Sequence, residues 1–505
     1  MIISPLLLFT FCILLSAAAI YMAIQWANIY RIADNPGEHK QHSKSTPFVG
    51  GVGVFVSLCA ALVVLIIFYP EQMQKWLVLG SCSVILFSVG FVDDIVRLSY
   101  KPRLIIQLIV ALMMVLAGGV VLHDLGELLP VQLGPLEVIF TVFATIGVFN
   151  AINMIDGIDG LSGSLSLVSM LLLGIVTYAP GSMPYFILIV AITGGLIGFL
   201  YFNLRHLAQS HARVFLGNNG SMLIGLLFAW LLIDISQGGS PAIRPVTAIW
   251  LLSIPLIDAV GIIHRRIYMG VSPFKSDRNH LHHILLRAGY RTEEVVFSLV
   301  FVHLLLGTIG LIGLHLAIPD FILLIGFFLV YAWLFYLMLH PWHFIPALCL
   351  MHTWLGLTPI ASRNTFFGRY IMKDSHRMAM VISKELRGKV DYWVRIFKQP
   401  GEDSCPGQHY AIALKIRLTD NSDNENSRIR KYIKLLENRL EIKHGIKLRQ
   451  LAERKEDKDW SLFSRDAGFG ELELKDQRKT KHRSLNAPVL AFEVTWAKGA
   501  TCGKK

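Results

Sequence analysis

Long apolar runs recur from the N-terminus of this chain to about residue 339. We count about eleven of them, each of roughly 17–22 residues and therefore long enough to cross a lipid bilayer as a helix. A helix satisfies its own backbone hydrogen bonds in lipid, so we predict one helix for each run. Only 16% of the residues are charged, against about 25% in soluble proteins. The runs cover residues 3–24, 48–69, 76–92, 104–122, 136–153, 163–179, 184–202, 219–236, 246–264, 297–317 and 321–339.

The basic residues of the loops indicate the orientation of these helices. If the N-terminus lies outside, almost every Lys and Arg of this region falls in a loop on the cytoplasmic side, and the opposite loops hold only Lys75 and Arg244. This asymmetry follows the positive-inside rule of membrane proteins. We therefore predict an all-α polytopic membrane protein with its N-terminus outside the cytoplasm.

The tail at 360–505 differs from the membrane region and holds essentially all of the net charge of +12. The stretches 411–418 and 490–496 alternate apolar and polar residues, as half-buried strands do, and 427–443 has the spacing of an amphipathic helix. We predict a soluble, cytoplasmic α+β domain. Its basic surface could bind anionic lipid headgroups or could simply be solvated, and the sequence does not decide between the two.

The segment 341–359 separates this tail from the predicted transmembrane domain at 1–340. It is apolar and aromatic, but histidines and prolines interrupt it. It could be a twelfth span or could lie in the membrane interface. We favour the interface, because a full crossing would place the basic tail outside.

Two adjacent carboxylates, Asp93 and Asp94, stand at the end of the third run, in FVDDIVRLSYKPR (91–103). The helix macrodipole disfavours anions at a helix C-terminus. Two like charges at this position therefore indicate a shared metal or a proton-transfer role. Pairing with Arg97 or Arg103 is the structural alternative.

The fifth run ends in NAINMIDGIDGLSG (150–163), which repeats a polar residue every third position. On one or two helical turns these side chains would share a face. The intervening glycines let the backbone turn or approach a ligand closely. The loop contains no basic residue, so its carboxylates lack a local partner. The repeating residues are Asn150, Asn153, Asp156 and Asp159.

Two further loops have features of phosphate sites. The loop after the first run, 33–51, places His42 and Lys44 among other cations ahead of a glycine pair. These cations would suit a diphosphate, although ordinary positive-inside bias explains them equally well. The stretch FLGNNGSMLIG (215–225) brings glycines to the start of the eighth run, and a helix N-terminus is a natural anion site.

The loop at 264–289 concentrates histidines and basic residues, among them Arg265, Arg266, His280, His282 and His283. The histidine spacing would allow zinc, but no carboxylate or cysteine completes a tidy zinc site. A phosphate-binding role fits the neighbouring arginines better. Asp258 lies about two turns inside the ninth run. It is either a functional carboxylate or a helix-packing contact.

These loops all fall on the predicted cytoplasmic side, and together they offer carboxylates for a divalent cation and cations for phosphates. That combination indicates phosphoryl transfer at a membrane surface.

The motifs of this sequence resemble those of a known family, the polyprenyl-phosphate N-acetylhexosamine-1-phosphate transferases. The resemblance covers roughly residues 25–340. It looks closest to the WecA type, which transfers N-acetylglucosamine 1-phosphate to undecaprenyl phosphate, because the last motif has the HLHH form after SPF. Five motifs occur in the family's order: DNPGEHKQHSKSTPFVGG, FVDDIVRL, NAINMIDGIDGL, FLGNNGS and SPFKSDRNHLHH.

The resemblance implies an exchange that depends on magnesium, with manganese as an alternative. A polyprenyl phosphate oxygen attacks the β-phosphorus of a UDP-sugar, and UMP leaves. Asp93 and Asp94 would lie beside the lipid phosphate, Asn153, Asp156 and Asp159 would bind the nucleotide and sugar, and Phe215 would pack on uracil. The histidines would hold the diphosphate, together with the cations of the loops. Asp94 and Asn218 would be metal ligands.

One position departs from the family pattern. The family usually has Asp in F-x-G-D-x-G-S, where this chain has Asn218. An amide oxygen can coordinate magnesium but carries no charge, so we expect weaker metal binding.

The resemblance further implies a bacterial inner-membrane enzyme with a cytoplasmic active site that initiates a cell-surface glycan. Its partners would be a UDP-sugar, a polyprenyl phosphate and the membrane, with no nucleic acid. The oligomeric state stays open, a homodimer included. The alternative is a non-catalytic or weakened member that binds the lipid carrier or acts as a membrane scaffold. A transporter is disfavoured because the runs show no inverted repeat.

Overall fold

The computed structural model describes two compact units, 1–286 with 291–339 and 287–290 with 340–505. Within them the described residues are 4–30, 46–128, 133–178, 182–205, 209, 211–238, 241–268, 270, 272, 280–288, 290–340, 348, 382, 392–398, 410–417, 430–438, 446–454, 472–476 and 489–496.

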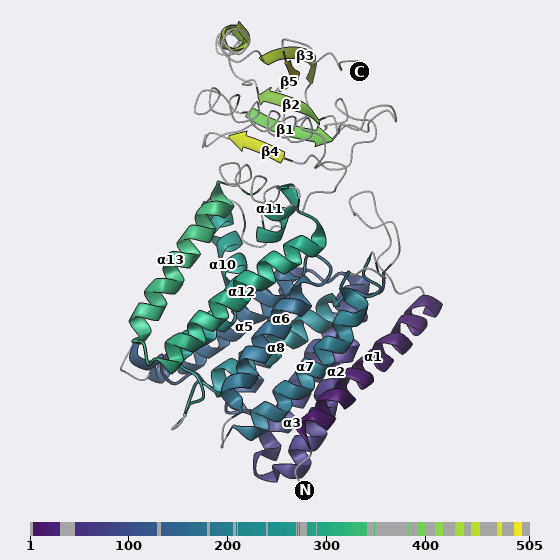
Figure 1. The fold of residues 1–505 in the computed structure, drawn as a ribbon, viewed down its shortest axis with the longest axis vertical. Helices are drawn as coiled ribbons and strands as arrows, with labels where there is room; N and C mark the ends of the chain where they lie inside the picture. Colours follow the sequence, from purple (N-terminus) through teal and green to yellow (C-terminus); the bar gives the residue numbers. More distant parts are fainter. Residues whose placement is uncertain are drawn as a thin grey trace, which may run out of the picture. The chain divides into compact units, whose positions relative to one another are not determined.

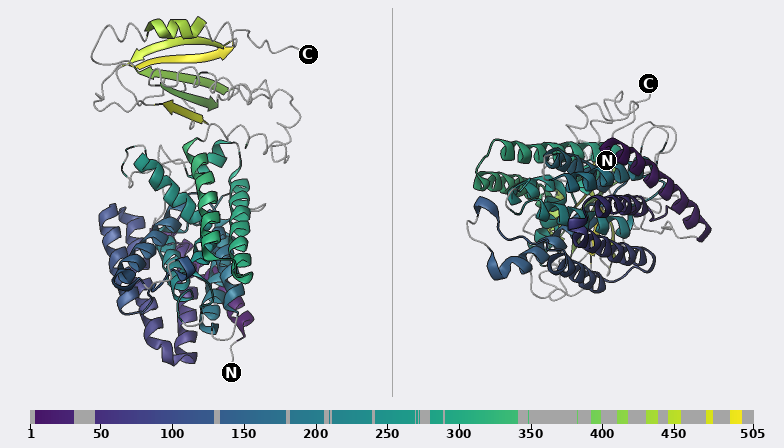
Figure 2. Two further views of the ribbon diagram at one scale, coloured as in Figure 1. Left: turned by 90° about the vertical axis from the view of Figure 1, so that its left-hand side faces the viewer. Right: turned by 90° about the horizontal axis from the view of Figure 1, so that it is seen from below.

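The first unit is a bundle of helices, with α1 and α13 at opposite edges (Figures 1 and 2). The helices are α1 (Pro5–Tyr30), α2 (Gly51–Phe68), α3 (Met73–Val96), α4 (Tyr100–Leu116), α5 (Glu137–Ile155), α6 (Leu161–Thr177), α7 (Met183–Asn203), α8 (Gly217–Asp234), α9 (Pro245–Leu251), α10 (Ser253–Tyr268), α11 (Leu281–Arg287), α12 (Thr292–His315) and α13 (Asp320–Leu339). Short 3-10 turns lie at Pro70–Gln72, Gly126–Leu128 and Gly134–Leu136.

Among the described residues, seven helices are long and apolar enough to cross a membrane, and an eighth span results if the bent pair α9 and α10 counts as one. The protein is therefore a multi-pass, mostly helical membrane protein. Each predicted apolar run overlaps a helix or this bent pair. However, α6 has only 17 residues, and the first turn of α8 contains two asparagines after Gly217. The count of eleven spans thus remains a prediction.

Helix α8 runs through the middle of the bundle and packs against α2, α3 and α5 (Figure 1). Nearly every residue from Gly217 to Ile233 is buried. Glycines allow this close packing: a Cβ at Gly225 would lie 2.8 Å from the Cα of Phe149, and one at Gly90 would lie 2.5 Å from the Cα of Asn219. The start of α8 is thereby held against the ends of α3 and α5.

The single helix predicted at 246–264 is wrong, because the chain forms two helices, α9 and α10, with a bend of 85° between them. Pro255 explains the break: it has no N–H, and its ring collides with the carbonyl four residues earlier in a continuous helix. That carbonyl belongs to Leu251, and it accepts a hydrogen bond from Ser169 Oγ at 2.7 Å instead. The backbone group freed by proline is thus satisfied by a neighbouring helix, as membrane proteins require.

A buried histidine completes the polar network at this break. His303 Nε2 lies 2.9 Å from Ser169 Oγ, and His303 Nδ1 lies 3.1 Å from Ser253 Oγ. Since the Ser169 hydroxyl proton goes to Leu251, we assign the Nε2–H tautomer to His303.

Charged side chains at the end of the bundle near Lys75 are paired. Lys75 Nζ and the Tyr185 hydroxyl both donate to Asp234, at 2.7 and 2.8 Å. Asp320 is fully buried, and it accepts from Arg244 at 3.0 Å and from the Glu127 backbone N–H at 3.1 Å. These contacts tie loops and helix ends together and explain the acidic residues there.

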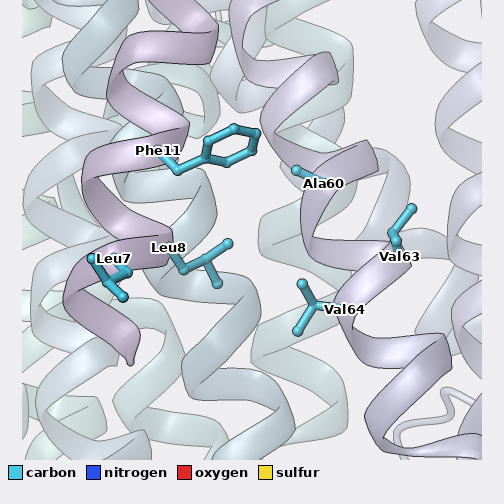
Figure 3. Close-up of a pocket in the computed structure, with 6 residues that line it drawn as sticks. All are labelled: Leu7, Leu8, Phe11, Ala60, Val63 and Val64. Atoms are coloured by element: carbon cyan, nitrogen blue, oxygen red, sulfur yellow. The ribbon is translucent and has the colours of Figure 1, made fainter. Parts of the chain in front are cut away.

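An apolar groove of about 450 Å³ lies between the N-terminal half of α1 and the C-terminal half of α2 (Figure 3). The N-terminus of α2 contacts the start of α8 through the Gly51 N–H and the Leu216 carbonyl, so the groove lies toward the opposite end of α2. Its lining residues are Leu7, Leu8, Phe11, Ala60, Val63 and Val64.

The second unit contains an antiparallel sheet with the order β3-β5-β2-β1-β4. Its strands are β1 (Tyr392–Lys398), β2 (Tyr410–Arg417), β3 (Ile446–Arg454), β4 (Leu472–Asp476) and β5 (Val489–Trp496). Strands β2 and β5 overlap the predicted stretches 411–418 and 490–496, and a helix at 430–438 buries Ile433 and Leu436. The segment 341–359, apart from Leu348, lies outside the described residues.

Candidate active site

Asp94 joins the end of α3 to the beginning of α8. Its Oδ1 accepts the Asn218 backbone N–H at 2.9 Å, and its Oδ2 accepts the Asn219 backbone N–H at 3.2 Å and Asn219 Nδ2 at 2.7 Å. Gly217 has φ +76°, and a Cβ there would lie 2.7 Å from Asp94 Oδ2, so glycine is required. The positive end of α8 therefore stabilises this carboxylate.

Asp93 has protein partners of its own. It is buried, and it accepts the Leu98 backbone N–H at 2.7 Å and an Arg103 guanidinium N–H at 3.3 Å. The pairing with Arg103 considered from the sequence is present. Asp93 and Asp94 thus have separate hydrogen-bond partners within the protein.

Asn218 faces α5 at the start of α8. Its Oδ1 accepts a hydrogen bond from Asn153 Nδ2 at 2.7 Å, and the same Nδ2 lies 2.9 Å from Ser221 Oγ. The amide oxygen that would serve a metal is therefore also the acceptor that ties α5 to α8. Asn150 lies further from this point and donates to Gln107 at 3.0 Å.

Asp159 has a basic partner that the sequence does not place near it. Arg205, after α7, donates from Nε to Asp159 Oδ2 at 2.7 Å. Asp159 also accepts the Ala212 backbone N–H at 3.4 Å. Asp159 thus lacks a basic partner in its own loop, as predicted, but has one from another helix end.

The loop backbone is fixed by Gly160. This residue has φ +81°, and its N–H donates to Asn203 Oδ1 at 2.7 Å. Asn203 in turn donates to the Val214 carbonyl at 2.8 Å. The loop is thereby anchored to the end of α7 and to the segment before α8.

Asp156 is different, because it makes no hydrogen bond or ion pair within the described part of the chain. It directly follows α5 and is half-buried. Burial, followed by the charges of Asp94 and Asp159, raises the pKa of Asp156 to about 7. This carboxylate therefore lies in a negative environment that a cation would relieve.

A histidine cluster lies against the same loop. The rings of His280 and His282 stack with centroids 5.4 Å apart, and His282 and His283 are 4.3 Å apart. A Cβ at Gly157 would lie 2.5 Å from His282 Nε2. The glycine beside Asp156 thus admits the histidine ring.

His282 is a buried polar side chain, and neither of its ring nitrogens has a hydrogen-bond partner among the described residues. Burial, followed by His283 and His280, holds the pKa of His282 well below its usual range. His282 is therefore neutral at pH 7, with one donor and one acceptor nitrogen for a ligand.

Asp258 completes this cluster. It is fully buried, its Oδ2 lies 2.6 Å from His280 Nδ1, and its Oδ1 accepts the Leu281 backbone N–H at 2.8 Å. A carboxylate thus contacts the histidine cluster, although within the described residues the group does not form a metal site. Asp258 lies 22 residues before His280, and its polar position inside an apolar run was the only sequence signal.

The remaining predicted residues are partly described. Arg265 and Arg266 lie in the last turn of α10, and Arg266 is buried. Phe215 lies 5.8 Å from Phe48, centroid to centroid. His42 and Lys44 lie outside the described residues.

Sequence reasoning missed Asn219. Its Nδ2 lies 2.9 Å from the Phe48 carbonyl as well as close to Asp94. Its Oδ1 is buried without a hydrogen-bond partner among the residues described. Its position next to Asn218, in the sequence GNNG, is the feature that could have identified Asn219 as a site residue.

A preformed metal cage is not present. Within the described residues, no group of three or more His, Cys, Asp or Glu side chains has the arrangement of a metal site. Magnesium needs no such cage, since proteins usually hold it through one or two carboxylates, waters and substrate phosphates. Asp156 without a partner and the Asn218 oxygen are donors of the required kind.

Fold and site together define a polytopic membrane protein with carboxylates, amides and histidines gathered at one end of a helix bundle. Residues 76–236 match the family model described as glycosyl transferase family 4. The chain belongs to this family.

Curated relatives extend the match over most of their own length. An undecaprenyl-phosphate alpha-N-acetylglucosaminyl 1-phosphate transferase of Haemophilus influenzae is 39% identical over 320 residues, which are 63% of this chain and 89% of the relative. Proteins with the same name from Yersinia pestis and Escherichia coli K12 are 34% and 32% identical, over 65% and 64% of this chain and 90% and 88% of theirs. Family membership was thus predicted correctly from the motifs.

Proposed function

We propose that this protein transfers N-acetylglucosamine 1-phosphate from UDP-N-acetylglucosamine to undecaprenyl phosphate and releases UMP. The names of the curated relatives support this activity. The lipid phosphate oxygen forms a bond to the β-phosphorus, and the bond from that phosphorus to the oxygen of the α-phosphate breaks. UMP carries away the electron pair, and the lipid diphosphate sugar remains in the membrane.

One observation carries the proposal: Asp156 and His282 flank Gly157, and each lacks a partner within the described residues. A carboxylate whose pKa is raised by burial and then by two neighbouring carboxylates would be stabilised in its charged form by a cation. A buried histidine with open nitrogens calls for a hydrogen-bonding group. A diphosphate with its divalent cation meets both requirements.

The proposal gives the other side chains the following roles. Asp94, held by the N-terminus of α8, and Asp93, held by Arg103, face the lipid phosphate side. Asn153 and Asp159 bind the nucleotide and sugar, with Asp159 oriented by Arg205. The same proposal includes further residues that contact the substrates. They are His280, His283, Arg265, Arg266, His42, Lys44 and Phe215.

Magnesium, or manganese in its place, is the proposed cofactor. When bound, it neutralises charge on the diphosphate and on the leaving UMP. Asp156, Asn218 and a free lone pair of Asp94 are the groups that would hold it.

The proposal extends to the arrangement in the cell. We place the protein in a bacterial inner membrane, with eleven spans, the N-terminus outside, and the site and the α+β tail domain in the cytoplasm. Loop charges support this orientation. We assign no oligomeric state.

The test follows the β-phosphorus. UDP-N-acetylglucosamine labelled with ³²P at the β-phosphate is given to purified protein with undecaprenyl phosphate and magnesium. Label in the lipid fraction is the expected result, and it should disappear in Asp94→Asn. The matched control is Asp234→Asn at the other end of α8, which should retain activity. Label that stays in the nucleotide, for every UDP-sugar tried, would favour a lipid-carrier binding or scaffold role.

A further inference from the structure

Asp258 lies within α10, and its side chain is fully buried. An ionised carboxylate without partners is very costly to bury, so its two oxygens must be satisfied. Both partners come from one short stretch at the start of α11. They are the Leu281 backbone N–H on Oδ1 at 2.8 Å and His280 Nδ1 on Oδ2 at 2.6 Å.

This geometry fixes the histidine as well as the backbone. A carboxylate that already accepts the Leu281 N–H acts as an acceptor, so His280 Nδ1 carries the proton that it donates to Oδ2. In the neutral ring, Nε2 is then left with a lone pair. The ring can neither rotate nor change tautomer without breaking a buried hydrogen bond.

The fixed ring is in contact with the proposed diphosphate site. His280 stacks on His282 with an angle of 18° between the ring planes. His282 in turn lies against Gly157, beside Asp156. A shift of His280 would therefore move the ring that borders the substrate loop.

We infer that Asp258 is a positioning residue, which holds His280 in one tautomer and orientation and thereby places the histidine cluster against the Asp156 loop. Asp258 does not contact substrate itself; it acts through His280. This inference rests on the proposed transferase activity and adds a residue that the sequence motifs do not contain.

The test is a double-mutant cycle on kcat/KM for UDP-N-acetylglucosamine with Asp258→Asn, His280→Asn and the double variant. Loss of a residue that orients a functional histidine typically costs about 10- to 100-fold. Because Asp258 acts through His280, the double variant should be no worse than His280→Asn alone. Losses that multiply, or an Asp258→Asn protein with the kcat/KM of the parent, would contradict the inference.

A matched control separates positioning from general stability. Asp320 is also fully buried and also accepts one backbone N–H and one side-chain N–H, the latter from Arg244, but it lies at the other end of the bundle. Asp320→Asn should lower the unfolding temperature and leave kcat/KM unchanged. An equal loss of kcat/KM in Asp320→Asn would reduce Asp258 to a structural residue.

A second variant covers the case in which Asp258→Asn does not fold. Asp258→Glu keeps the carboxylate and should retain more kcat/KM than Asp258→Ala at equal folded yield; equal losses would count against positioning. Binding of UDP, measured by calorimetry, distinguishes the two proposals. A parent that neither binds UDP nor turns over contradicts the proposed function, whereas an active parent with multiplicative losses contradicts only the role of Asp258.

Discussion

Asn153 donates a hydrogen bond from Nδ2 to the Oδ1 of Asn218 over 2.7 Å, and this bond joins the end of α5 to the start of α8. Asn218 stands where the resembling family usually has Asp. A carboxylate would accept the same bond and would add a negative charge beside Asp94. If the proposed metal role holds, the side chain at this position would set how strongly the site attracts a cation.

We predict that Asn218→Asp activates at lower magnesium concentration than the parent. A gain of one ligand charge should lower the half-saturating concentration about tenfold, equivalent to ~1.4 kcal/mol. The measurement is a magnesium titration of UMP release, with Asn218→Ala as the control that removes the oxygen. Identical magnesium curves for parent and Asn218→Asp would show that position 218 does not serve the metal.

Asp156 should make stability depend on pH. Its folded-state pKa of about 7 lies above the ordinary aspartate value of about 3.9, so the folded protein binds more protons than the unfolded chain between these values. Stability should therefore fall as pH rises through this window and level off above it. Unfolding temperatures in cation-free buffer, measured from pH 5 to 8, test this.

Two variants test whether Asp156 is the source of this pH dependence of the unfolding temperature. Asp156→Asn should flatten the pH dependence, whereas Glu71→Gln, a change at an exposed carboxylate, should leave the parent slope. A parent whose stability rises with pH over the same range would show that the carboxylate is ionised and satisfied.

Removal of Arg205 should destabilise the protein. Arg205→Met leaves the buried Asp159 carboxylate without its cation, and because Arg205 is partly exposed we expect a loss of about 1–3 kcal/mol. Thermal unfolding in detergent measures it. The double variant Arg205→Met with Asp159→Asn should recover part of the lost stability, since no unpaired buried charge remains. If the destabilisations of the two single variants simply add in the double variant, the two side chains do not stabilise each other.

The network at the break between α9 and α10 should also be sensitive. Ser169→Ala removes the donor to the Leu251 carbonyl and should cost about 1–3 kcal/mol, the usual penalty for an unsatisfied buried polar group. Ser81→Ala is the matched control, because Ser81 donates to its own helix at an exposed position. Equal unfolding temperatures for the two variants would mean that water or another group satisfies the carbonyl.

Much of the fold could be predicted from sequence because apolar periodicity and length report directly on membrane helices. Each predicted run overlaps a helix or a bent pair, and the motif carboxylates Asp94, Asp156 and Asp159 gather at one end of the bundle. The bend was missed because counting apolar residues ignores Pro255, although its effect on a helix is well defined.

The pairings within the site could not be predicted because they join distant positions. Asp94 and Asn219 are 125 residues apart, and Asp159 and Arg205 are 46 apart. No local pattern specifies which helix ends meet, so a carboxylate that looked unpaired in its own loop had a partner from another. Asp258 shows the same limit, since its partner His280 lies 22 residues further along the chain.

The most direct test of the central claim is UMP release by the purified protein given UDP-N-acetylglucosamine, undecaprenyl phosphate and magnesium, with Asp156→Asn alongside. The account predicts turnover that requires lipid, nucleotide sugar and metal together, and a loss of at least about 100-fold in Asp156→Asn. No UMP from the parent with any UDP-sugar, or full activity in Asp156→Asn, would contradict it.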